Sequence, residues 1–135
     1  MSTSVYRAET DKSIEQFVAD FIDLVKSKGF TIHNDGKMAM KDIFSAHGQD
    51  VADDFDLHMI QLCKPEKAAK SLSSNPERSV LMPKFIMVFS QDGKTQVRML
   101  RYGGDLISEL VEDADFPASL EETFTNLTKF IDAAV

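Results

Sequence analysis

Apolar side chains recur at spacings of three and four residues near the beginning of the chain, a pattern typical of an amphipathic helix. Ser13 precedes this run and Gln16 follows three residues later, which predicts a capping box at the helix start. Gly29 follows Lys28 and predicts a left-handed stop at the other end. The stripe that this helix buries is expected to consist of Ile14, Phe17, Val18, Phe21, Ile22 and Val25.

Two shorter helices are expected in the middle of the chain. The first runs from about residue 37 to 47, and Gly48 ends it. The second begins at Pro65, because the fixed φ of proline suits the first turn of a helix, and it closes at Asn75-Pro76.

Two more helices are expected near the end of the chain. Asp105 is predicted to cap a short helix that runs through Val111. Ser119 with Glu122 predicts a capping box that opens a final amphipathic helix. The apolar face of this last helix is Leu120, Phe124, Leu127 and Ile131.

The clearest strand pattern is a hairpin across residues 84–100. Asp92-Gly93 suits the two central positions of a type I′ turn, where both residues need positive φ. That turn places Val88 opposite Val97. The first strand is apolar on both faces, so it is expected to lie inside its sheet.

Further strands are expected at residues 55–63, 4–8 and 30–34. The apolar phase of 55–63 shifts midway, which suits either a bulge or burial on both faces. The resulting order is β-α-β-α-β-α-β-β-α-α. It predicts an α+β fold, in which helices pack against a mostly antiparallel sheet of about five strands.

Composition narrows the class of protein. The chain has 135 residues, 43% of them hydrophobic and 27% charged, which predicts a single domain over residues 1–135. Its net charge is −7, and the positive residues are scattered along the sequence, so neither nucleic acid nor an anionic membrane is expected as a partner. No signal peptide or membrane-spanning run stands out, and a cytoplasmic location is expected.

Cys63 is the single cysteine, and it lies in QLCKPEKAAK, where a strand is expected to give way to a helix. If the helix begins at Pro65, its unpaired N–H groups and the neighbouring Lys64 favour a thiolate. No second cysteine is present to resolve an oxidised thiol, so a dithiol oxidoreductase is excluded. Two interpretations remain open: a reactive single thiol, or a small apolar residue packed at a strand end.

Metal and phosphate sites find little support. His33, His47 and His58 are more than ten residues apart from one another, so no metal ion or other cofactor is expected. Gly103-Gly104-Asp105 could cradle a phosphate through its N–H groups, but Asp105 would repel it, and a turn is expected instead.

The order of several short motifs resembles the uncharacterised family known as domain of unknown function 302. The motifs that carry this resemblance are Lys28-Gly29-Phe30, Cys63-x-Pro65, Ala69 and Leu72, Pro76-Glu77, and Leu81-Met82-Pro83 before the apolar strand 85–89. Members commonly carry Asn at the position of Lys64 and a second cysteine at the position of Lys84. The resemblance implies a compact α+β domain and a homodimer, without an established activity.

The sequence is compatible with two functions. The leading hypothesis is a non-catalytic module that binds a small ligand or a protein partner, in a pocket or dimer groove where helices meet the sheet. Met59, Met87 and Lys84 are its candidate residues, although methionines are also common in cores. The rival is a thiol protein that carries sulfur or forms a mixed disulfide through Cys63, assisted by Lys64 and Pro65.

Overall fold

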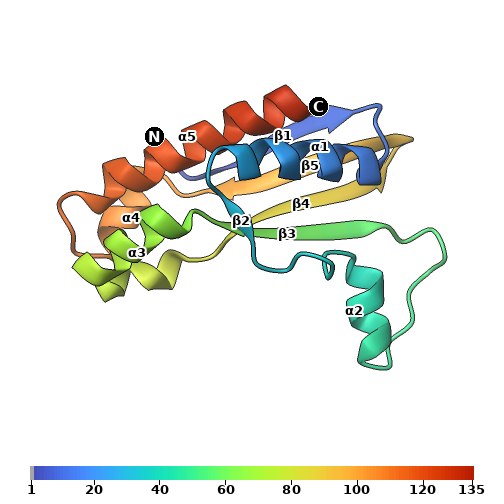
Figure 1. Ribbon diagram of the computed structural model, residues 1–135, viewed down its shortest axis with the longest axis horizontal. Coiled ribbons are helices and arrows are strands. Elements are labelled where there is room, and N and C mark those ends of the chain that lie inside the picture. Colours follow the sequence, from blue (N-terminus) through green and yellow to red (C-terminus); the bar gives the residue numbers. More distant parts are fainter. Residues whose placement is uncertain (1) are drawn as a thin grey trace.

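A five-stranded antiparallel sheet forms the framework of the computed structural model, which describes residues 2–135 (Figure 1). Its strands lie in the order β1-β5-β4-β3-β2, so the predicted α+β class and element order are confirmed. The strands are β1 (Ser4–Thr10), β2 (Thr31–Ile32), β3 (Leu57–Cys63), β4 (Lys84–Gln91) and β5 (Lys94–Arg101).

The β4–β5 hairpin follows the prediction from its turn residues. Asp92 and Gly93 have φ of 56° and 75°, and Val88 pairs with Val97. β4 is the central strand of the sheet, as its two apolar faces indicated. β3 pairs with β4 without interruption from Leu57 to Leu62, so its irregular apolar pattern reflects partial burial on both faces and not a bulge.

Two long helices cover one face of the sheet. Figure 1 shows α1 and α5 side by side over the strands, and their apolar stripes meet the inward residues of β3, β4 and β5 in one core. The helices are α1 (Ile14–Ser27), α2 (Met40–Ala46), α3 (Pro65–Ser74), α4 (Gly104–Leu110) and α5 (Phe116–Ala134), with a 3₁₀ helix, η1, at Pro76–Leu81. The six predicted residues of α1 are all buried.

The start of α1 uses half of the predicted capping box. The Ser13 hydroxyl accepts a hydrogen bond from the Gln16 N–H at 3.1 Å. The Gln16 side chain does not reach back, because its amide donates to Asp20 at 2.8 Å. Gly29 ends the helix region with φ of 90°, as expected for a left-handed stop.

The start of α5 differs from the prediction. The helix begins at Phe116, three residues before Ser119, with Pro117 in its first turn. The carboxylate of Asp113 caps it instead, since it accepts the Phe116 N–H at 2.9 Å. Ser119 therefore lies inside the helix, where its backbone oxygen is available to a neighbouring side chain.

The second face of the sheet has little cover. α2 packs against β3 near one edge, and it is shorter than predicted, with no fully buried residue. Val5 and Leu100 are paired across β1 and β5 on this face and are 44% and 50% exposed, and Phe85 on β4 is 39% exposed. We call Val5, Phe85 and Leu100 the exposed row.

Candidate functional site

A cavity lies where the end of β3 and the start of β4 meet α3 and the first half of α5. Its volume is about 40 Å³, which is room for about three water molecules. A second lobe of about 150 Å³ adjoins this first lobe. The two lobes share the lining residues Phe30, Lys64, Lys67 and Thr123. The remaining lining residues are Cys63, Ala68, Ser71, Met82, Lys84, Phe116, Ser119 and Leu120 in the first lobe and Lys28, Asn126 and Phe130 in the second.

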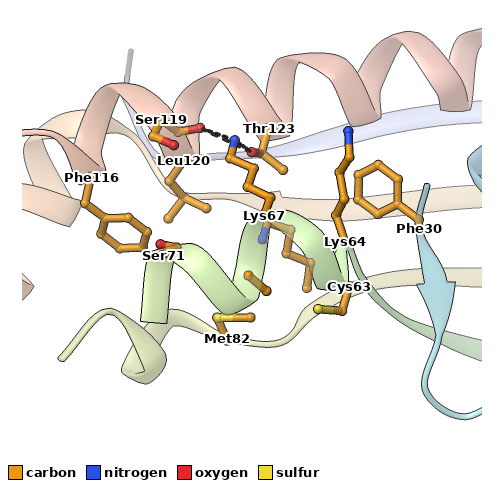
Figure 2. Close-up of a pocket in the computed structure, with 12 residues that line it drawn as sticks. Phe30, Cys63, Lys64, Lys67, Ser71, Met82, Phe116, Ser119, Leu120 and Thr123 are labelled. Carbon is orange, nitrogen blue, oxygen red and sulfur yellow. Dashed lines mark hydrogen bonds between the residues drawn. The ribbon is translucent and has the colours of Figure 1, made fainter. Parts of the chain in front are cut away.

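The predicted strand-to-helix joint is present, and its residues build one wall of the cavity. β3 ends at Cys63, which pairs with Thr31 of β2, and α3 begins two residues later at Pro65. Lys64 is the extended N-cap between them and makes no side-chain capping bond, so its side chain is free to turn elsewhere. Cys63 is only 8% exposed, and the part of its surface that remains faces the cavity (Figure 2).

Four lysines surround the two lobes: Lys28, Lys64, Lys67 and Lys84. Figure 2 shows Lys67 reaching from α3 to α5, where its ammonium group donates to Thr123 Oγ1 at 2.6 Å and to the Ser119 carbonyl at 3.3 Å. The Lys64 ammonium lies 5.8 Å from the centre of the Phe30 ring. We call the two lobes and these four side chains the lysine cavity.

The lysine cavity has no acidic lining residue among residues 2–135. The lysines that form ion pairs in this part of the chain are Lys12, Lys26, Lys70 and Lys94, so none of the four cavity lysines is neutralised. The expectation that positive charge is scattered is therefore wrong in space. The fold gathers residues far apart in sequence into one cationic site, within a chain of net charge −7.

Lys84 occupies the most enclosed position of the four. It begins β4, pairs with Leu62 of β3, and lies 6.0 Å from the centre of the Phe124 ring in the core. Burial lowers the pKa of its ammonium group; charge on the nearby Cys63 opposes this shift, and the positive charge of Lys67 adds to it. A larger share of this side chain is therefore neutral amine than for an exposed lysine at the same pH.

An ion-pair network supports the wall opposite the joint. Arg78 of η1 donates to Asp113 at 2.6 and 2.9 Å and to the Ser71 hydroxyl at 3.0 Å, and its guanidinium lies 5.1 Å from the Phe116 ring centre. Hydrogen bonds from Arg78, and then from Asn75, hold the pKa of Asp113 well below its usual range. The Asp113 carboxylate thus holds Phe116 directly, through its N–H, and holds Ser71 indirectly, through Arg78.

The structure separates the other predicted site residues from this cavity. Met59 and Met87 are paired across β3 and β4 on the sparsely covered face of the sheet, whereas Lys84 lies on the helix-covered face. The three therefore do not line one pocket. Cys63, Lys64 and Lys84 do meet, and Pro65 fixes the helix that carries Lys67.

The other candidate sites are separate as well. His58 Nε2 lies 3.4 Å from Asp56 Oδ1, and Glu15 is near both, whereas His33 and His47 are elsewhere. At the glycine pair, the Gly104 N–H already donates to the carboxylate of Glu121 of the same chain. Asp105 is not the cap of α4, since Gly103 holds the N-cap position and Asp105 lies in the first turn.

Sequence reasoning missed Lys67, Ser119 and Thr123 as site residues. Lys67 and Thr123 are 56 positions apart, and no local spacing connects them. A usable signal was the excess of lysine around the helix start, at Lys64, Lys67 and Lys70, two of which line the cavity.

Fold and site together define an α+β domain with an antiparallel sheet, helices on one face and a cationic cavity at a strand-to-helix joint. The sequence matches the family described as "Domain of unknown function DUF302" over residues 6–134, and the chain belongs to this family. No curated protein matches the sequence. Among residues 2–135, no helix has both the length and the apolar character needed to cross a membrane.

A solved structure has the same fold. It is the crystal structure of an uncharacterized conserved protein DUF302 from Bacillus stearothermophilus, with a TM-score of 0.68 and 17% sequence identity. The superposition covers 96% of this chain and 94% of that chain. At this identity the similarity concerns the fold alone.

Proposed function

We propose that this protein is a binding module for a small anion, held in the lysine cavity, and that it does not catalyse a reaction of its own. The observation that carries the proposal is the presence of four lysines around one cavity, none with an acidic partner among the described residues. Like charges that share a partly enclosed site repel one another, and an anion between them removes that cost. The site therefore gains free energy from an anionic guest.

The remaining lining groups favour a compact oxyanion. Ser71, Thr123 and Asn126 supply neutral hydrogen-bonding groups, and Phe30 and Phe116 supply apolar walls. Ammonium groups bind phosphate and carboxylate oxygens through charge-assisted hydrogen bonds. A phosphate-bearing or carboxylate-bearing metabolite of a few heavy atoms fits this chemistry.

The test is the binding of inorganic phosphate, pyrophosphate and malonate, measured by calorimetry and by the shift in melting temperature. Lys67→Gln is expected to weaken binding of the best anion by about tenfold, the loss of about 1.4 kcal/mol. Lys129→Gln, an exposed lysine of α5 outside the cavity, makes the same charge change and is expected to alter affinity less than twofold. Absence of binding by all three anions, or equal loss in both variants, overturns the proposal.

A thiol function remains the second candidate, because Cys63 lines the same cavity as Lys64 and Lys84. In this interpretation Cys63 carries sulfur or forms a mixed disulfide with a partner. Native Cys63 is then expected to react with iodoacetamide faster than a model thiol at pH 7, and Lys84→Gln to slow the reaction. Alkylation that requires denaturant would assign Cys63 to packing.

A further inference from the structure

We propose that Lys84 forms an imine with an aldehyde or keto group of the anionic ligand, so that the lysine cavity holds its ligand covalently and reversibly. This inference rests on the proposed function. It assigns two tasks within one site: the outer lysines recognise the anion, and the innermost lysine reacts with a neighbouring carbonyl carbon.

The position of Lys84 is what a reactive amine needs. Its side chain ends between the apolar core, where Phe124 lies beneath it, and the cavity, where Lys67 and Cys63 are its charged or titratable neighbours. No hydrogen bond or ion pair holds its ammonium group within the described part of the chain. The side chain is therefore partly enclosed, has no hydrogen-bond or ion-pair partner among the described residues, and forms part of the cavity wall.

Enclosure and like charge also supply the nucleophile. A lysine becomes nucleophilic when it is neutral, and desolvation with a second cation nearby is the established way to achieve this near neutral pH. Here Lys67 is that cation, from α3, and Lys64 lies at the start of the same helix. α5 contributes neutral Ser119, Leu120 and Thr123 to the wall, and no carboxylate among the described lining residues favours the charged form of Lys84.

The chemical step balances without another reactant. Lys84 first loses a proton to solvent, and its nitrogen lone pair attacks the carbonyl carbon, forming the C–N bond of a carbinolamine as the C=O π bond breaks. The carbinolamine oxygen then takes up protons and leaves as water, which gives a protonated C=N bond. The sum is R–NH₃⁺ plus O=CR₂ giving R–NH⁺=CR₂ plus H₂O, and nothing is oxidised or reduced.

The experiment uses glyoxylate, which joins an aldehyde to a carboxylate, with sodium cyanoborohydride to trap the imine and peptide mass mapping to find it. Lys84 is expected to be labelled at least tenfold faster than the exposed Lys70 and Lys129. Its rate is expected to rise with pH to a plateau reached at lower pH than theirs. Labelling that is even across the lysines, or that favours an exposed one, overturns the proposal.

Lys84→Arg separates this inference from the function on which it rests. Arginine keeps the positive charge but has no reactive amine, so this variant is expected to lose the fast label while binding of malonate or phosphate is still detected by calorimetry. Anion binding without a fast label at Lys84 in the natural chain overturns the imine alone. Absence of anion binding, together with equal labelling by glyoxylate and uncharged propionaldehyde, overturns the binding function.

Discussion

At the scale of single residues, Lys84 is where function and stability oppose each other. The ammonium group of Lys84 is half-buried and has no hydrogen-bond or ion-pair partner among residues 2–135, which costs free energy because its lost hydration is not replaced. Lys84→Met keeps a side chain of similar length and removes that cost. We expect it to raise the free energy of unfolding at pH 7 by about 1 kcal/mol and to weaken anion binding, as measured by urea denaturation and calorimetry.

The same variant predicts a pH dependence with a definite sign. Because the pKa of Lys84 is lower in the folded chain than its ordinary value of 10.5, the unfolded chain binds more protons between the two values. The natural protein therefore gains stability as pH rises through that interval, and its deficit relative to Lys84→Met should shrink from pH 7 to pH 10. A constant difference across this range would contradict the assigned cause.

Residues of the candidate site could be predicted only where they are adjacent to one another in the sequence. Cys63, Lys64 and Pro65 adjoin in sequence, so the joint that they form could be inferred from the proline and the preceding apolar run. Lys84 could be singled out in the sequence because it replaces a cysteine that is common in the family. Thr123 carries no local signal, because its contact with the site depends on how α5 crosses α3.

At the scale of elements, local patterns predicted strands and helices better than they predicted helix starts. The β4–β5 hairpin and α1 follow from turn residues and apolar spacing, which are local causes. The start of α5 does not, because its cap is the Asp113 carboxylate in an ion pair with Arg78, 35 residues away in sequence. A helix therefore does not always begin at a capping motif in the sequence, because a contact with a distant residue can stabilise a different start.

The Asp113 network predicts the effect of a single substitution on α5 and on the cavity wall. The side chains of Asp113 and Arg78 are only 7% and 12% exposed, and Asp113 also accepts the N–H groups of Asp115 and Phe116. Asp113→Asn keeps the shape but removes the charge that faces Arg78. We expect it to lower the melting temperature by several degrees and to weaken anion binding by loosening Phe116 and Ser71.

The pH dependence of this loss is fixed by the depressed pKa of Asp113. The ion pair stabilises the fold above the ordinary carboxyl value of 3.8 and stops doing so as pH falls through the lower folded-state value. The gap in melting temperature between the natural chain and Asp113→Asn should therefore be constant near neutrality and close below pH 4. Asp54→Asn, in an exposed connection, is the matched control and should show no such gap.

At the scale of the whole molecule, the arrangement of helices leaves two unlike surfaces. α1 and α5 cover one side of the sheet and bury most of its apolar residues, and the lysine cavity opens at the end of that side. The other side carries the exposed row, with Met59 and Met87 beside it. This difference between the two faces could not be predicted from the sequence, because the alternation of apolar residues along each strand does not identify the face that the helices cover.

The exposed row is the surface on which the homodimer implied by the family resemblance can be tested. Three large apolar side chains on adjacent strands form a continuous patch, and a two-fold axis would bury that patch against its own copy. We predict that the natural chain is a dimer in light scattering coupled to size exclusion, and that Leu100→Lys is a folded monomer, because two buried ammonium groups would face each other.

Leu110→Lys is the control for this prediction. It changes a leucine of α4 that is 55% exposed and lies outside the exposed row, and it should remain dimeric. A monomeric natural chain would remove the homodimer prediction, and a dimer that persists in Leu100→Lys would place the contact on another surface.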